Sequence, residues 1–429
     1  MYSLTNPLGP HDTAPSQVLA SHPKPLFAVG GIGSAYLTFG ALSTSLVFYG
    51  FFADLLGAAG ETVRLSAIIT TAILTLSGGA ICLLRGKIAA LCLTLAGLFS
   101  IFLFLYVFSM NSGVPFTLNS GGEYIGLTFT GLFALTLQDR TFGQVMRWFF
   151  TLCCGYALVY LIATLALRTG YIDGGAITRA IASADDVGRG DRIHAASLFL
   201  VFGTAYSVAQ IRLRFAAPYL LTAVLFAITW WVTDSRTITA VTFLVVVGYF
   251  LIRQVPLLGR AAFLTYLAGT LFSIVLLIDP SFNPFLYFGD QSASIRVNSV
   301  EMASQSMQYY WLTGAGISFG VENYRPLTGI TYFFPGDIGM MGVFYMYGVA
   351  GLIIYMFICY LGCHAYWPVV KRGYSPILGE AVALTGIVLA IYSLQAPQYN
   401  GGSSASIFAM LLLALTLQTQ VVTVGRQAS

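Results

Sequence analysis

Charged residues are scarce in this chain. Lysine, arginine, aspartate and glutamate together make up 8% of its 429 residues, whereas 57% are hydrophobic and the mean hydropathy is +0.80. A soluble domain carries roughly a quarter charged residues, so too few are present to cover a water-facing surface. The composition excludes an ordinary soluble protein, and it leaves no length for a separate soluble domain.

The sequence also contains no pattern typical of a disulfide framework, a metal site or a nucleotide-binding site. The six cysteines all fall in or directly beside apolar runs, so no disulfide framework is expected outside the membrane. Cys359, Cys363 and His364 are close in sequence, and a packed helix end is favoured there over a metal site. No P-loop or dinucleotide fingerprint occurs, and no metal, cofactor or nucleic-acid partner is expected.

Long apolar runs predict an all-α, polytopic membrane protein of about twelve transmembrane helices, at about 20 residues for each. The first run is too long for the apolar core of a signal peptide, so it is expected to remain as a permanent span. The runs lie near Leu26–Phe52, Leu65–Leu84, Ile88–Ser109, Leu118–Gln138, Trp148–Leu167, Ala195–Ile211, Phe215–Thr233, Thr237–Ile252, Ala261–Ile278, Gly339–Gly362, Pro376–Leu394 and Ser404–Val422.

Basic residues divide the loops into two faces. Lys and Arg mark the cytoplasmic side, so both ends are predicted to be cytoplasmic, as tails 1–25 and 423–429 around one transmembrane domain, 26–422. The cytoplasmic face receives Lys24, Arg85, Lys87, Arg140, Arg147, Arg212, Arg214, Arg253, Arg260, Lys371, Arg372 and Arg426. The outer face has no lysine but eight arginines: Arg64, Arg168, Arg179, Arg189, Arg192, Arg236, Arg296 and Arg325.

Ionisable residues are nearly absent from the apolar runs themselves. Only Glu123 and Glu380 fall inside them, the first near an outer end and the second near a cytoplasmic end. Transporters and proton pumps usually keep charged groups near the membrane midplane, where the ion path runs. The pattern favours an enzyme at the outer face over a transporter.

Two outer loops are long, at 168–194 and 279–337. The first is polar and glycine-rich, and it fits either a mobile solvated loop or a functional one. The second is rich in aromatic residues, and Ser292–Trp311 is predicted to be a helix at the membrane interface. Its aromatic side chains, with Tyr309, Tyr310, Trp311 and Tyr332 as the candidates, fit either an interfacial belt or a platform for sugar rings.

Two stretches of the second half carry a family likeness. The first is the outer turn Thr233–Thr237, which contains Ser235 and Arg236. The second starts at Ser294-Ile295-Arg296 and continues through Leu312-Thr313-Gly314-Ala315-Gly316, Pro335-Gly336-Asp337 and Tyr347-Gly348-Val349-Ala350-Gly351. With the topology, these stretches resemble the superfamily of O-antigen ligases and Wzy-type polysaccharide polymerases, whose fold is GT-C-like.

Within that superfamily the sequence favours a polymerase. Ligases typically have a histidine where this chain has Asp337, and the loop 279–337 contains no histidine. Some polymerases carry an arginine and a glycine separated by ten residues in each of two outer loops. Arg179 with Gly190 and Arg325 with Gly336 fit that spacing.

The resemblance implies a bacterial inner-membrane enzyme with its active site on the periplasmic face. It would be a metal-independent glycosyltransferase that joins oligosaccharide repeats linked to undecaprenyl pyrophosphate. Partners in the same pathway would be a flippase and a chain-length regulator. Two alternatives stay open: an O-antigen ligase that transfers glycan to lipid A core, and a flippase or exporter of the lipid-linked sugar.

Arginine suits a pyrophosphate because its planar fork donates two parallel hydrogen bonds and stays charged. Arg236, Arg296 and Arg325 are the candidates, with Arg179 as a fourth. The competing interpretation is ion pairing, although the acids nearest in sequence to Arg296 and Arg325 are only Glu301 and Glu322. Asp337 is the candidate base for the acceptor hydroxyl or, alternatively, a helix N-cap.

Overall fold

The computed structural model describes residues 58–115, 141–172, 181–182, 192–193, 195–233, 235–287, 291–317, 324–330, 333–399, 405 and 408–416. The spans predicted at 26–52 and 118–138 lie outside these residues, as do parts of the last one, of which the structure describes 405 and 408–416. The helices are α3 (Ala58–Leu84), α4 (Ile88–Ser112), α6 (Phe142–Arg168), α7 (Ser197–Arg214), α8 (Ala217–Thr233), α9 (Arg236–Leu251), α10 (Val255–Ile278), α11 (Gln291–Tyr310), α12 (Arg325–Thr328), α13 (Gly339–Cys363), α14 (Tyr366–Val370) and α15 (Pro376–Tyr392), with the 3₁₀ turns η4 (Pro280–Phe282), η5 (Pro284–Tyr287) and η7 (Pro335–Asp337).

The predicted all-α class is confirmed in the described part of the chain. Within the described residues, one antiparallel ribbon departs from this class. It lies in the first long loop, where β1 (Ile181–Ala182) pairs with β2 (Arg192–Ile193). The ribbon is tied to α6, because the Tyr160 hydroxyl donates to the Ile193 carbonyl at 2.7 Å. This end of the loop is therefore held by the bundle.

Four of the described helices are long and apolar enough to cross a membrane. They are Ala90–Ser112 within α4 and the whole of α6, α10 and α13. Large apolar side chains on these and neighbouring helices are exposed, including Leu76, Leu84 and Ile278, each of which keeps at least 75% of its surface accessible. Such surfaces are unfavourable in water and favourable against lipid. The protein is therefore membrane-associated.

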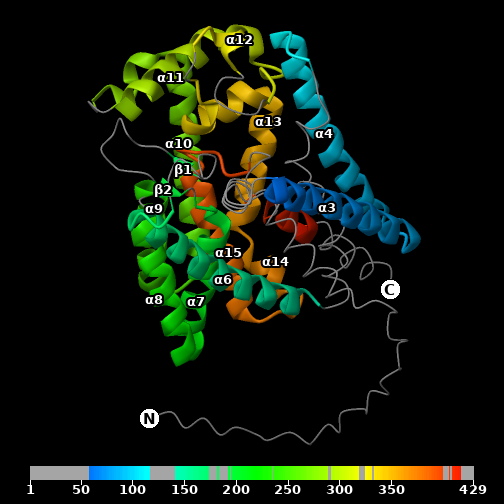
Figure 1. Cartoon of the computed structure of the whole chain (residues 1–429), viewed down its shortest axis with the longest axis vertical. Helices are drawn as coiled ribbons and strands as arrows, with labels where there is room; N and C mark the ends of the chain where they lie inside the picture. Colours follow the sequence, from blue (N-terminus) through cyan, green and yellow to red (C-terminus); the bar gives the residue numbers. More distant parts are fainter. Residues whose placement is uncertain are drawn as a thin grey trace, which may run out of the picture.

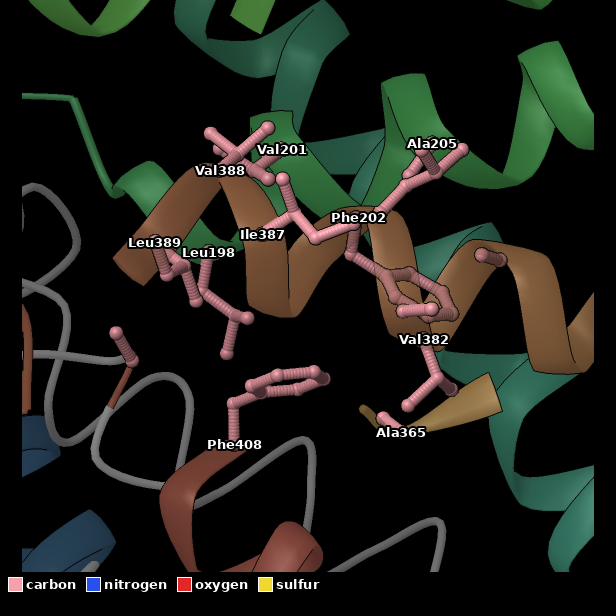
Figure 2. Packing of buried hydrophobic residues seen from close by; sticks show 14 of the residues in the cluster. Leu198, Val201, Phe202, Ala205, Ala365, Val382, Ile387, Val388, Leu389 and Phe408 are labelled. Carbon is pink, nitrogen blue, oxygen red and sulfur yellow. The ribbon is translucent and has the colours of Figure 1, made fainter. Parts of the chain in front are cut away.

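The main core forms around two central helices, α7 and α15. Nearly every residue of Leu198–Gln210 and of Ile377–Ala390 is buried. Figure 2 shows Leu198, Val201 and Phe202 of α7 against Val382, Ile387, Val388 and Leu389 of α15, with Phe408 below them. Helices α6, α8, α9, α10 and α13 pack around this pair.

One carboxylate is buried in the main core. Glu380 of α15 accepts a hydrogen bond from the Tyr249 hydroxyl of α9. The Arg212 guanidinium lies 4.2 Å from the centroid of the Tyr249 ring and donates to the Tyr249 carbonyl at 3.0 Å. A buried charge is tolerated only when it is hydrogen-bonded and compensated. These residues therefore link α7, α9 and α15.

Different elements lie at the two ends of the bundle (Figure 1). At one end, called here the α11 end, lie α11, α12 and the upper end of α4. At the opposite end lies α14, in the connection between α13 and α15. Helix α11 was expected at Ser292–Trp311, and its observed bounds differ by one residue at each end. The prediction of a helix in the second long loop is confirmed.

Candidate functional site

The described parts of the second long loop are folded onto the ends of three long helices. Side chains of the loop pack with α4, α10 and α13 around a second hydrophobic core, which we call the loop core. Its buried members are Leu105, Phe108, Leu276, Leu277, Val300, Ala303, Met307, Ala315, Ile317, Tyr324, Phe333, Ile338, Met341, Tyr345 and Met346. These parts of the loop are therefore fixed in place by the helices that they cover.

Helix α13 is broken at Gly348, and the segment Leu312–Ile317 lies against the break. In an unbroken helix, the Val349 N–H would donate to the Tyr345 carbonyl. Here the Val349 N–H donates to the Trp311 carbonyl at 2.9 Å, and the Tyr345 carbonyl accepts from the Ala315 N–H at 2.7 Å. Trp311 and the segment thus satisfy both groups that the break releases, as buried backbone groups require.

Two glycines make this contact possible. Gly348 has φ 65° and ψ −167°, a region that is open essentially to glycine alone. A Cβ atom on Gly348 would lie 2.2 Å from the Leu312 carbonyl oxygen, and one on Gly314 would lie 2.2 Å from the Met346 carbonyl oxygen. Both Gly-containing motifs of the family resemblance, Gly314–Gly316 and Tyr347–Gly351, therefore meet backbone to backbone.

Helix α4 joins the same contact from the first half of the chain. The Ile317 N–H donates to the Phe104 carbonyl at 3.2 Å, and the Asn111 amide donates to the Ala315 carbonyl at 3.2 Å. The Phe104 ring packs edge-on against Tyr347 at 4.9 Å between centroids. This contribution of α4 cannot be predicted from the sequence, because nothing in a uniformly apolar helix signals which loop it will contact.

Arg296 lies on the buried face of α11, one turn after Ala293 and one turn before Val300. Its side chain is half-buried, and its guanidinium carbon is 5.4 Å from the centroid of the Phe285 ring, a cation–π distance. Its Nε atom is buried without a hydrogen-bond partner. Glu301 on the same helix is exposed, and no ion pair joins it to Arg296. Pairing with Glu301 therefore does not explain this arginine.

Arg325 and Asp337 are exposed, and each is the direct neighbour in sequence of a residue of the loop core. Arg325 follows Tyr324, whose hydroxyl donates to the Gly316 carbonyl at 3.2 Å. Asp337 ends η7 and precedes the buried Ile338. The N-cap position of α13 is Ile338, so Asp337 lies one residue before the cap. The loop core therefore anchors both side chains at the α11 end.

The remaining candidate arginines are not brought to this contact. Arg236 is the exposed first residue of α9, a helix that packs on α7, α10 and α15. Arg179 lies outside the described residues, although the ribbon at Ile181 begins two residues later. The structure thus associates Arg296, Arg325 and Asp337 with one core, and it leaves Arg236 on a different group of helices.

The candidate aromatic residues divide into two kinds. Tyr309 and Trp311 expose 74% and 55% of their surface. Tyr310 is half-buried, packs edge-on against Tyr345, and its pKa is raised by burial. Tyr332 lies outside the described residues. Tyr309 and Trp311 therefore remain accessible at the end of α11, whereas Tyr310 belongs mainly to the packing of the loop.

Within the described ranges, no three His, Cys, Asp or Glu side chains come together as a metal site would require. No protein-family model matches the chain, and no curated protein matches it. The chemistry of the α11 end must therefore be argued from its own residues.

Proposed function

We propose that the protein is a bacterial inner-membrane glycosyltransferase that polymerises oligosaccharide repeats linked to undecaprenyl pyrophosphate. It crosses the membrane about twelve times in a GT-C-like fold, with the α11 end on the periplasmic face. The product is a surface or secreted polysaccharide. The observation that carries the proposal is the backbone contact between Gly314–Gly316 and the break at Gly348, since these are two separate motifs of the family resemblance.

A second observation supports the same function. Arg296 is half-buried beside an aromatic ring and has an unpartnered Nε at the end of the molecule where that contact lies. An arginine that is held without an acid partner suits a multiply charged leaving group. Arg325 is exposed beside the same core and supplies a second cation.

The proposed reaction displaces undecaprenyl pyrophosphate as the leaving group. An acceptor sugar hydroxyl attacks the anomeric carbon of the donor sugar, and the bond from that carbon to the pyrophosphate oxygen breaks. Undecaprenyl pyrophosphate leaves with the electron pair, and Arg296 and Arg325 stabilise its developing charge. The hydroxyl proton passes to Asp337, which is exposed and can meet an acceptor from the periplasm.

Two classes of activity compete with this one, and gene deletion separates them. Loss of a polymerase should abolish long polymer and leave single lipid-linked repeats on the periplasmic side. Repeats that accumulate facing the cytoplasm would identify an exporter. Polymer of normal length that fails to attach to lipid A core would identify a ligase.

The site assignment is tested by Arg296→Lys, with Arg260→Lys as the matched control. Lysine keeps the charge and loses the planar fork, so turnover should fall about ten- to a hundredfold if one charge-assisted hydrogen bond of about 1.5–3 kcal/mol is lost. Arg260 is exposed near the start of α10, and its substitution should leave polymer unchanged. The measurement is polymer length against protein abundance. Normal polymer from Arg296→Lys would remove Arg296 from the site.

A further inference from the structure

Buried polar side-chain atoms without partners occur both on α11 and on the turns η4 and η5 that pack against it. Three such atoms are Nδ2 of Asn283, Nε of Arg296 and Oγ of Ser299. Asn283 and Ser299 are each 1% exposed, so water does not reach them from the surface. Leaving a buried donor unpaired is unfavourable, so each of these atoms requires an explanation.

Asn283 lies between η4 and η5, and both of these turns pack against α11. Its Oδ1 accepts from the Phe285 N–H at 3.0 Å, which fixes the amide and leaves Nδ2 as the free donor. The Phe285 ring contacts the Arg296 guanidinium, so η5 lies against α11 at this residue. A second contact joins α11 to α10, because Ser304 Oγ donates a hydrogen bond to the Leu277 carbonyl at 2.6 Å.

Ser299 follows Arg296 by three residues on α11, so the two side chains lie on adjacent turns of one helix face. That face is buried in the loop core through Val300 and Ala303. The serine hydroxyl, the arginine N–H and the asparagine amide can all donate hydrogen bonds, and one of the three groups carries a positive charge. A ligand that accepts from all three would carry anionic oxygen atoms.

We propose that Asn283, Arg296 and Ser299 form one subsite for a phosphate group, with Phe285 holding the guanidinium in position. Its assignment to the pyrophosphate of a lipid-linked donor rests on the proposed function. The same chemistry would also accept the phosphate of a phospholipid headgroup. Arg296 supplies charge, and Asn283 and Ser299 supply fixed donors at a buried position, where hydrogen bonds to an anion are strongest.

The test uses the full chain in nanodiscs and three variants. Ser299→Ala removes the unpaired hydroxyl. Asn283→Asp keeps the Oδ1 that accepts from Phe285 and replaces the free donor with a second oxygen. Ser306→Ala is the matched control on the same helix, because its Oγ already donates to the Met302 carbonyl at 2.7 Å. Binding of undecaprenyl pyrophosphate and of phosphatidylglycerol is measured, together with the melting temperature without ligand.

We expect Ser299→Ala to weaken binding of undecaprenyl pyrophosphate about tenfold and Asn283→Asp to weaken it further, since the new carboxylate repels the anion. Ser306→Ala should bind as the wild type does. Without ligand, Ser299→Ala should melt no lower than the wild type, because it loses no hydrogen bond. A lower melting temperature with unchanged binding would make Ser299 structural and overturn the subsite.

The outcomes separate the subsite from the proposed function. If the wild type binds undecaprenyl pyrophosphate and both variants bind it equally well, the subsite is wrong and the function stands. If only phosphatidylglycerol binding responds to the variants, the subsite stands and the donor assignment fails. If neither ligand responds, the subsite is overturned.

Discussion

Replacing Gly348 with alanine tests whether the break in α13 holds the site together. The backbone angles at Gly348 cost about 1–3 kcal/mol for a residue with a side chain, and the added Cβ would also lie 2.2 Å from the Leu312 carbonyl oxygen. Release of the segment Leu312–Ile317 would relieve the strain. Release would also break the hydrogen bonds that the N–H groups of Ala315, Gly316 and Val349 donate, at about 0.5–1.5 kcal/mol each.

The strain and the clash act on the docked segment and are absent from the released one, so docking should be destabilised by about 2–4 kcal/mol. The ratio of docked to released protein should then fall about 30- to 700-fold. Ala315→Cys in a cysteine-free background reports this ratio directly, because Ala315 is fully buried when the segment is docked. Its rate of labelling by a water-soluble maleimide should rise by up to that factor, and polymer should shorten or disappear.

Gly155→Ala is the matched control. Gly155 lies within α6, and a Cβ atom there would meet nothing within 4 Å, so alanine should be neutral or slightly stabilising. If Gly348→Ala labels at Ala315→Cys no faster than Gly155→Ala does, and polymer is normal, the break does not hold the segment. The interpretation of the site would then fail.

Other perturbations separate chemistry from structure. Asp337→Asn should keep membrane abundance and stop transfer if Asp337 is the base, whereas normal polymer on a gel would leave the base unassigned. Tyr249→Phe leaves the buried Glu380 without its donor and should lower the free energy of unfolding by about 1–3 kcal/mol, seen as a lower melting temperature without a direct effect on donor binding. Purified enzyme should keep its turnover in EDTA, and activity restored only by added magnesium or manganese would refute a metal-free mechanism. A reporter fused at Ser429 should be cytoplasmic, and a periplasmic signal would reverse the orientation.

Helix positions were the most predictable part of the structure. The span predicted at Gly339–Gly362 is observed as Gly339–Cys363, and Pro376–Leu394 as Pro376–Tyr392. Helices α6 and α10 start about two turns before the predicted positions, because hydropathy assigns Arg147 and Arg260 to loops. Both lie within helices with exposed side chains. Lys and Arg near a helix end can direct their charge away from the apolar zone, so hydropathy truncates such helices.

The arrangement of the candidate site was much less predictable. Asp337 and Arg296 were identified as residue types that suit the chemistry, but their common core depends on side chains from α4, α10 and α13. The break at Gly348 gives no signal in an apolar run, since a glycine is also common in unbroken membrane helices. Asn283 and Ser299 also carry no signal in the sequence, because only burial without a hydrogen-bond partner distinguishes them from other polar loop residues.

The order of the chain bears on how the protein is made. Trp311 and the segment Leu312–Ile317 are synthesised before Tyr345, Met346 and Val349, the residues of α13 with which they form hydrogen bonds. Before α13 is synthesised, the segment can contact α4, as the hydrogen bond of Asn111 to Ala315 across 204 positions shows, and soon afterwards Tyr324, but not its partners in α13. Domains assembled during synthesis fold as their last partners emerge. A chain that stops before Val349 would therefore carry every candidate arginine and still lack the site.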